Sequence, residues 1–392
     1  MTGPAPLLRN LALAAVSTAV ALGLLELAAR ALGPREPTGK LSAYMQDDPV
    51  LGWRHRPGAH AVFALRECDV DVKINSHGLR DPERDPNVQN AVRILALGDS
   101  FVEAFSVPAM RGVTRLLEES LDRAIPGPVV VVNGGTAGYS TDQEVLFFES
   151  EAAKVDPHVV VLFFFFNDVM GNLSDVMGGA FKPYFAIDAD GLVLKNVPVP
   201  AQPIRTAHAP APPPEEGSAL LRLCGERLKN GAPRAYNSLA RFGLWEPLRP
   251  RPTRDDFKVY RRHRSPDVES AWTVTARLLE RLARGVEARG ARLLVVYVPS
   301  RIEVTERDWQ LTCLRYGWDE TNASRFRVVE RLADIARDVG FPLLDLSPAL
   351  RAADWGVLGG PYYPTDLHWN ALGHEVAARE VERWLRREAW VP

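Results

Sequence analysis

The segment Arg93-Ile-Leu-Ala-Leu-Gly-Asp-Ser-Phe101 joins an apolar run to a Gly-Asp-Ser turn. The apolar run predicts a buried strand over 92–97. A serine that follows such a strand, where a helix is about to begin, lies at the edge of a sheet with its hydroxyl toward solvent. This position can present a nucleophile, and the helix N-terminus supplies backbone N–H groups for a developing oxyanion. Because Gly-Asp-Ser is also a common turn, Ser100 is a candidate nucleophile that needs support from other segments.

Apolar strands alternate with helical patterns on both sides of the longest insertion. The predicted strands are Val92–Leu97, Val129–Asn133, His158–Phe166, Arg292–Val298 and Pro342–Leu346. The predicted helices are Gly112–Ala124, Gln143–Lys154, Glu269–Arg289 and Ser324–Val339. This alternation predicts an α/β fold with about five parallel strands and helices on both faces, a three-layer α/β/α arrangement. Right-handed crossovers bring the carboxyl ends of the strands to one edge, where ligands bind in open α/β sheets.

The composition divides the chain into three parts. Residues 1–34 form an N-terminal membrane anchor or signal peptide, and residues 35–90 a β-rich extension with strands at 62–65 and 70–74. Residues 91–392 form the α/β domain, with an insertion at about 172–265 where the alternation lapses. Proline and alanine dominate 198–218, so we expect the insertion to be largely irregular.

The N-terminus indicates export. An uncharged stretch, Leu11–Leu25, follows Arg9 and is closed by Glu26 and Arg30. Flanking leucines and alanines extend it toward the length of a spanning helix, with the arginines snorkelling. We favour an uncleaved anchor, and a cleavable signal peptide stays open because Ala29-Arg-Ala31 resembles a cleavage site. Either alternative places most of the chain outside the cytoplasm.

The bulk composition excludes two classes of function. The chain has 392 residues, a formal net charge of −2 and a pI near 6.5, which argues against nucleic acid as a partner. Its three cysteines, Cys68, Cys224 and Cys313, form no Cys-x-x-Cys pair and have no histidine at metal-ligand spacing, so we expect no metal site. At most one disulfide is possible, and we favour buried free thiols.

Two polar segments follow the second and third predicted strands. The glycines of Val132-Asn-Gly-Gly-Thr-Ala-Gly138 allow close backbone approach to a ligand, and the N–H of Gly138 is a candidate oxyanion donor. A simple strand-to-helix turn is the alternative. Asn167-Asp168 follows four phenylalanines, so the Asn167 amide is held rigidly and can donate from its side chain. An Asx-type helix cap is equally compatible with that position.

A histidine near the C-terminus supplies a candidate base. In Tyr363-Pro-Thr-Asp366-Leu-His368, residues two apart in an extended segment point to the same side, so Asp366 can orient His368 and stabilise its imidazolium form. Of the eight histidines, only His368 combines a loop at the sheet edge with a carboxylate two residues away. His374 is predicted to lie within the last helix.

These four segments, in this order and each after a predicted strand, resemble the SGNH (GDSL-type) hydrolase superfamily. The resemblance covers about Val92 to Trp384 apart from the insertion, and implies a flavodoxin-like sheet. It extends upstream to Asn75-Ser-His-Gly-Leu-Arg-Asp81, which is similar to a motif of membrane-anchored bacterial members. Two departures stand out: Phe164 stands where the third block, Gly-x-Asn-Asp, is expected to have glycine, and the last block is Asp-x-His instead of Asp-x-x-His.

The resemblance implies a role for each candidate residue. Ser100 would be the nucleophile, His368 the general base and Asp366 the residue that orients it. The Ser100 and Gly138 N–H groups and the Asn167 side chain would form the oxyanion hole, with no metal or organic cofactor.

The implied activity is a serine esterase that removes acyl groups, acetyl among them, from envelope glycans, lipids or small esters. An O-acyltransferase using the same residues stays open, as does a weakly active glycan-binding or scaffold protein of polysaccharide export. The expected location is the bacterial cell envelope, with a single-pass inner-membrane anchor, or a secreted or periplasmic protein after signal cleavage. The sequence does not indicate an oligomeric state.

Overall fold

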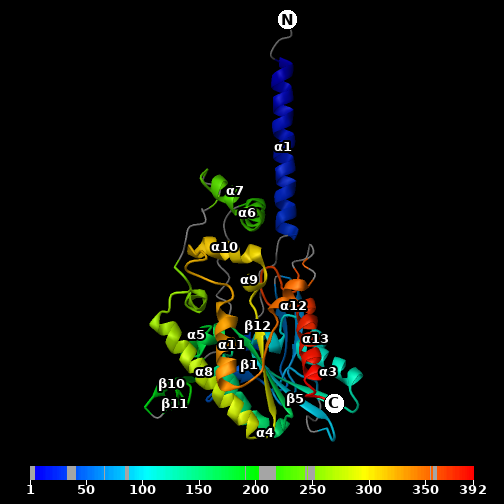
Figure 1. Cartoon of the computed structure of the whole chain (residues 1–392). Coiled ribbons are helices and arrows are strands. Elements are labelled where there is room, and N and C mark those ends of the chain that lie inside the picture. The colour runs from blue at the N-terminus through cyan, green and yellow to red at the C-terminus, as the bar shows by residue number, and fades with distance from the viewer. Residues whose placement is uncertain are drawn as a thin grey trace. The chain divides into compact units, whose positions relative to one another are not determined.

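The fold was described from a computed structural model of the chain. It describes residues 5–32, 41–65, 67–83, 88–189, 191–202, 218–242, 245, 252–353, 355 and 360–392. The chain forms two compact units, one from residues 1–36 and 210–251 and the other from residues 37–209 and 252–392 (Figure 1). The second unit carries the sheet and every candidate site residue.

A five-stranded parallel sheet forms the centre of the second unit, as predicted. Its order is β13-β12-β7-β5-β6, and every neighbouring pair is parallel. The strands are β5 (Val92–Gly98), β6 (Val129–Gly135), β7 (Val159–Phe165), β12 (Arg292–Val298) and β13 (Leu343–Asp345). The carboxyl ends of β5, β6 and β7 therefore lie at one edge of the sheet.

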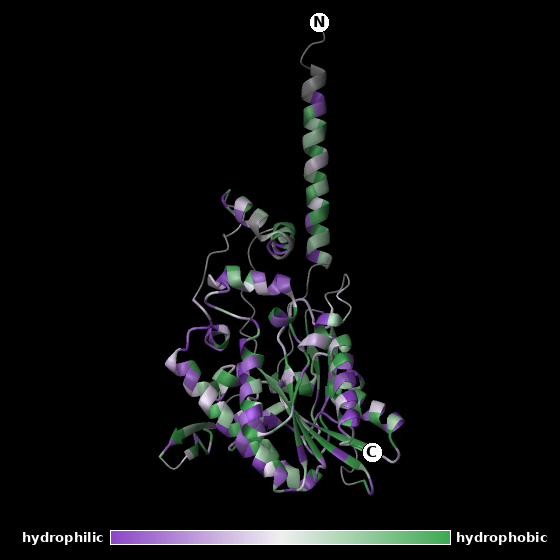
Figure 2. Cartoon of the chain, viewed as in Figure 1, coloured by the Kyte–Doolittle hydropathy of each residue, from purple (hydrophilic) through white to green (hydrophobic). Residues whose placement is uncertain are grey.

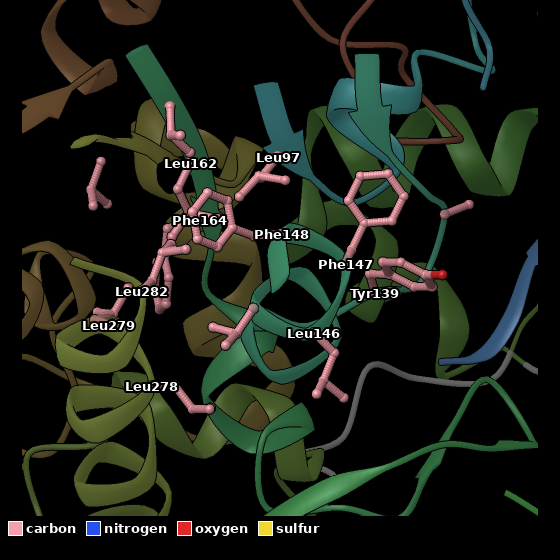
Figure 3. Packing of buried hydrophobic residues seen from close by; sticks show 14 of the residues in the cluster. Leu97, Tyr139, Leu146, Phe147, Phe148, Leu162, Phe164, Leu278, Leu279 and Leu282 are labelled. Carbon is pink, nitrogen blue, oxygen red and sulfur yellow. The ribbon is translucent and has the colours of Figure 1, made fainter. Parts of the chain in front are cut away.

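The strands β5, β6, β7 and β12 are largely buried on both faces, which explains their long apolar runs, whereas β13 is half-buried. Leu95 and Leu97 of β5 enter one hydrophobic core, and Ile94 and Ala96 enter the other. The first face is covered by α4 (Thr141–Val155), α8 (Pro266–Glu287) and α11 (Arg327–Val339); the second is covered by α3 (Val113–Ala124), α12 (Ser347–Ala352) and α13 (Ala371–Arg387) (Figure 1). In the first core, Phe148 of α4 lies beside Phe164 of β7 and leucines of α8, and Phe147 lies beside Tyr139 (Figure 3).

The N-terminal extension packs on the first core. It contains η1 (Leu41–Ala43), the antiparallel pair β1 (Met45–Asp48) and β2 (Gly52–His55), and the antiparallel pair β3 (His60–Ala64) and β4 (Asp69–Lys73). The strands β3 and β4 lie one or two residues earlier than predicted. Trp53, Phe63, Val70 and Val72 are buried in the same cluster as the sheet residues, so the extension shares the core of the α/β unit.

The insertion is more regular than its composition indicated. Two hairpins form within the α/β unit: β8 (Val176–Met177) with β9 (Ala180–Phe181), and β10 (Tyr184–Asp188) with β11 (Gly191–Lys195). Gly178 and Gly179 supply the positive φ angles of the first turn. The segment ends with η3 (Asp255–Tyr260), and residues 203–217 of the proline-rich stretch lie outside the described residues.

Several short helices complete the α/β unit. Those that follow strands β5, β7 and β12 are α2 (Ser100–Glu103), α5 (Asn167–Gly171) and α9 (Arg301–Val304). The others are η2 (Ala109–Arg111) and α10 (Glu306–Tyr316). The sequence patterns did not predict α9, α10 or α12.

The other unit contains α1 (Ala5–Leu32), α6 (Ala219–Gly231) and α7 (Pro233–Ala240). Within α1, residues Arg9–Ala31 have a mean hydropathy of 2.0 and are long and apolar enough to cross a membrane (Figure 2). A signal sequence has the same properties. The Glu26 carboxylate of α1 accepts hydrogen bonds from the Ala219 and Leu220 N–H groups, at 2.9 Å each, and so caps the first turn of α6.

Candidate active site

Ser100 is the first residue of α2, directly after β5. Gly98 ends the strand, and a Cβ there would lie 2.5 Å from Val102 Cγ2, so the turn requires glycine. Asp99 caps α2, because its carboxylate accepts a hydrogen bond from the Phe101 N–H at 2.9 Å. Asp99 is buried, and this burial raises the pKa of its carboxyl to about 6.

Ser100, His368 and Asp366 form a continuous hydrogen-bonded chain. Ser100 Oγ lies 2.8 Å from His368 Nε2, and His368 Nδ1 lies 2.6 Å from Asp366 Oδ1. Ser100 and His368 are 268 residues apart in the sequence and meet at the carboxyl end of β5. In this arrangement Nδ1–H donates to the carboxylate, which leaves the Nε2 lone pair to accept from the serine hydroxyl.

The pKa of His368 is raised above its ordinary value. Burial of the ring lowers it, but the negative charge of Asp366 and its hydrogen bond outweigh that effect, and Asp99 and Glu103 add to the rise. The imidazole therefore has the basicity that a general base needs near neutral pH. Phe101 and Phe105 flank the ring, with centroid distances of 5.1 and 4.9 Å.

The geometry that joins Asp366 to His368 differs from the predicted extended segment. Leu367 has φ +70°, in the left-handed region, and its N–H donates to the Tyr363 carbonyl at 3.2 Å. The chain therefore makes a turn, and Asp366 Oδ1 faces both the N–H and the ring Nδ1 of His368. A left-handed leucine costs of order 1 kcal/mol or more, which the surrounding contacts must offset.

The Gly138 loop leaves β6 beside α2. Gly135 pairs with Gly98 across the sheet, and a Cβ at Gly135 would lie 2.3 Å from the Glu103 nitrogen. The Ala137 N–H donates to Glu103 Oε2 at 2.5 Å, so the loop is bonded to the helix that begins with Ser100. Gly138 itself has φ +80°, a conformation that favours glycine.

Asn167 is the first residue of α5, directly after β7, which pairs with β5. The helix cap is Phe166 and uses no side-chain hydrogen bond, so Asn167 is not the Asx cap that its position also allowed. Its Oδ1 is buried without a hydrogen-bond partner among the described residues. The residue two positions before Asn167, where the Gly-x-Asn-Asp block has glycine, is Phe165 and not Phe164 as the sequence analysis stated; Phe165 contacts Phe101 at 4.8 Å between ring centroids.

Two buried acids lie near the site: Glu144, which the sequence analysis missed, and Asp168, which it named beside Asn167 without giving it a role. Glu144 and Asp168 are buried, and burial together with neighbouring carboxylates raises the pKa of each well above its ordinary value. Thr141 Oγ1 donates to Asp168 Oδ2 at 3.1 Å, whereas both oxygens of Glu144 lack a partner among the described residues. The feature of the sequence that could have revealed Glu144 is an acidic residue within the apolar face of α4.

No cluster of metal ligands was found in the described part of the chain, counting groups of three or more His, Cys, Asp or Glu side chains. Cys68, Cys224 and Cys313 are free thiols. Cys68 and Cys313 are half-buried, but Cys224 is exposed, contrary to the expectation that all three are buried, because it lies on an outer face of α6.

Comparison with known proteins points to one family. Residues 257–392 match the family model described as ALGX, SGNH hydrolase-like domain, acetyltransferase AlgX. This match includes His368 and Asp366, whereas Ser100, Gly138 and Asn167 precede it. A search of curated protein sequences gave no match.

Solved structures give weak overall similarity. The structure of TesA has a TM-score of 0.39 at 12% identity, covering 75% of this chain and 98% of that one. A lipase/acylhydrolase from Enterococcus faecalis has a TM-score of 0.38 at 12% identity, with 76% and 96% covered. The psychrotrophic esterase EstA from Pseudoalteromonas sp. has a TM-score of 0.37 at 11% identity, with 76% and 98% covered.

Proposed function

Since the chain carries an SGNH hydrolase-like domain, we propose that it is a serine-dependent enzyme that hydrolyses acyl esters. The observation that supports this most is the chain of hydrogen bonds from Ser100 Oγ through His368 to Asp366. A serine, a histidine and a carboxylate in this order are the arrangement that activates a hydroxyl for acyl transfer.

In the proposed mechanism His368 Nε2 takes the proton of Ser100 Oγ as that oxygen attacks the ester carbonyl carbon. Asp366 stabilises the imidazolium that forms. The oxyanion accepts hydrogen bonds from the Ser100 and Gly138 N–H groups and from the Asn167 side chain; loss of one such donor typically costs about 3–4 kcal/mol. When the carbon–oxygen bond to the alcohol breaks, His368 gives its proton to the leaving alkoxide.

Water then attacks the acyl-Ser100 carbonyl carbon while His368 takes a proton from it. As the bond between that carbon and Ser100 Oγ breaks, His368 returns the proton to Oγ and the carboxylic acid leaves. We propose acyl esters of envelope glycans, lipids or small molecules as the substrate class. The apolar helix α1 supports a substrate in the cell envelope, because either an anchor or a signal peptide would carry the α/β unit out of the cytoplasm. No step requires a metal or organic cofactor.

O-acyl transfer is a second candidate, favoured by one observation. The matching family model is described by an acetyltransferase, AlgX. Transfer shares the acyl-Ser100 half of the reaction and differs only in the acceptor, since a sugar hydroxyl replaces water. The two candidates therefore differ in the fate of the acyl group and not in the residues that form the intermediate.

The decisive experiment uses nitrophenyl esters from acetate to long acyl chains, with the wild type and Ser100→Ala. We expect turnover by the wild type and a fall of at least about 10³-fold in kcat for the variant. A fluorophosphonate probe should label Ser100 in the wild type only. Wild-type turnover that Ser100→Ala retains would refute the mechanism, and an unlabelled, inactive wild type would favour a binding or scaffold role.

Adding an oligosaccharide to the acetyl ester reaction separates the two candidates. A hydrolase releases acetate at an unchanged rate. A transferase forms acetylated oligosaccharide at the expense of acetate, and this product should be absent with Ser100→Ala.

A further inference from the structure

The N-terminal extension contacts three of the segments that carry candidate catalytic groups: α2, the Gly138 loop and the His368 loop. We propose that residues 41–83 are a positioning element of the active site, which holds the Gly138 loop (136–140) and the His368 loop (363–368) against α2. This inference rests on the proposed function for its kinetic part only. Three sets of contacts, each with a different loop, support it.

Trp53 of β2 holds the Gly138 loop. Its indole N–H donates to the Ala137 carbonyl at 3.0 Å, and the Tyr139 hydroxyl donates to the Trp53 carbonyl at 2.6 Å. A Cβ on Gly138 would lie 3.4 Å from Trp53 Cζ2, so the indole ring also packs against the glycine. The Ala137 carbonyl and the Gly138 N–H belong to the same peptide group, so the Trp53 bond fixes the direction of that N–H, while the bond from the Ala137 N–H to Glu103 fixes the preceding peptide.

Arg80, in the upstream motif Asn75–Asp81, holds the end of α2. This residue is buried, and its guanidinium donates to the carbonyls of Glu103 at 2.8 Å, Ala104 at 2.5 Å and Val107 at 2.8 Å. A cation at a helix C-terminus is favourable because the free carbonyls there carry partial negative charge. Tyr44 adds a bond from its hydroxyl to Glu103 Oε1 at 2.8 Å.

Glu67, in the turn between β3 and β4, holds the His368 loop. Its Oε1 accepts hydrogen bonds from the N–H groups of Thr365 at 2.8 Å and Asp366 at 3.3 Å. These bonds fix the backbone immediately before the left-handed Leu367. The next residue, Cys68, lies with its sulfur 3.4 Å from the Tyr363 hydroxyl at the start of the same loop.

Most of these hydrogen bonds are made to backbone atoms of the loops and of α2, and the other three involve the side chains of Tyr139, Glu103 and Tyr363. The extension residues therefore act through the loops that they hold. Catalytic groups must stay within about 0.5 Å of the productive geometry, and a misplacement of about 1 Å can cost on the order of 10²-fold in rate. Residues in such a role should affect kcat more than KM.

The test compares variants of the full-length protein on a nitrophenyl ester. Trp53→Phe removes the indole N–H but retains an aromatic ring. Glu67→Ala removes the carboxylate that accepts hydrogen bonds from the backbone of the His368 loop. We expect each to lower kcat about 10- to 100-fold with KM changed by less than about threefold. Glu67→Gln keeps an oxygen acceptor and should restore most of kcat. Asp71→Asn, an exposed change in the same extension, is the matched control.

Hydrogen–deuterium exchange gives a readout that does not depend on activity. Trp53→Phe should accelerate exchange in 136–140 and leave 363–368 unchanged, and Glu67→Ala should do the reverse. A general loss of stability would accelerate both loops together. If both variants fold and keep wild-type kcat and wild-type exchange in the loops, the extension packs on the α/β unit without positioning the loops, and the proposal is wrong.

The two proposals fail in different ways. A wild type with no Ser100-dependent turnover refutes the proposed function, and the loop-specific exchange still decides whether the extension positions the loops. If Trp53→Phe does not fold, the comparison of Glu67→Ala with Glu67→Gln still tests the proposal. Glu67 is only half-buried in a surface turn, so its replacement should leave the fold intact.

Discussion

At the scale of single residues, Asp366 controls both the orientation and the charge of His368. Its Oδ1 lies 2.6 Å from His368 Nδ1, and its negative charge raises the pKa of the imidazole against the lowering effect of burial. A general base acts in its neutral form. The activity should therefore rise with pH through the raised pKa of His368, above the ordinary value of a histidine.

Replacing Asp366→Asn should lower kcat and move the pH profile. The amide removes the negative charge and favours the wrong tautomer of the ring, so we expect a fall on the order of 10³–10⁴-fold in kcat. Because the raising effect is lost, the pKa of His368 falls and the acidic limb of log kcat/KM shifts to lower pH. Measurement of kcat/KM from about pH 5 to 9 checks this, since loss of orientation alone would lower the curve without shifting it.

The positions of the candidate residues at the strand ends follow from the local sequence, while their roles stay predictions. Ser100, Gly138 and Asn167 each follow an apolar strand, and the parallel order of those strands brings their ends to one edge. The Asp366–His368 contact was expected for a different reason, because the left-handed turn at Leu367 is not visible in the residue pattern. Glu67 was missed because its partners lie almost 300 residues away, and no local pattern records such a pairing.

At the scale of elements, α4 carries a buried acid toward the sheet. Glu144 has no partner for either oxygen among the described residues, and burial raises the pKa of its carboxyl well above the ordinary value. The folded protein therefore keeps a proton there that the unfolded chain releases above about pH 4.5. With the folded pKa raised, this group favours folding at low pH, and its contribution is lost as the pH rises toward the folded pKa.

Glu144→Gln should make the protein more stable at about pH 8 than the wild type, by on the order of 1 kcal/mol, and less so at about pH 5. The amide has nearly the same shape and does not ionise, so the cost of keeping the proton disappears. Urea unfolding at the two pH values measures the difference. Glu149→Gln is the control, since Glu149 is a half-exposed residue of the same helix that pairs with Arg281. Equal effects of both substitutions would contradict the assignment to Glu144.

The prediction of helices and strands succeeded where hydrophobic periodicity is strong, and it failed for short elements whose structure depends on contacts with other parts of the chain. The five sheet strands and the helices α3, α4, α8 and α11 lie within a few residues of their predicted bounds. The short helices α9 and α12 follow the ends of β12 and β13, and of the two only α9 has a side-chain cap. The Ser300–Glu303 capping box marks the start of α9 in the sequence, but a prediction based on the alternation of long strands and helices does not use it.

At the scale of the whole molecule, the apolar helix and the candidate site belong to different compact units. Residues Arg9–Ala31 lie in one, while Ser100, His368 and all residues that hold their loops lie in the other. The extension, by contrast, shares the core of the α/β unit. A cut before residue 41 should therefore separate the apolar helix from the candidate site, whereas a cut after residue 83 would remove an extension that shares the core of the α/β unit.

Removing residues 1–40 should convert a membrane-bound protein into a soluble one with its esterase kcat changed by less than about threefold. An apolar stretch of about 20 residues is enough to span the bilayer, so the full-length protein should remain in the membrane pellet after alkaline carbonate extraction. N-terminal sequencing of the recovered protein distinguishes an anchor from a signal peptide. A mature chain that starts near residue 32 and is extracted as soluble protein would show cleavage, because the span would then be gone. Loss of activity in the truncated but folded protein would instead mean that the first 40 residues help to form the site.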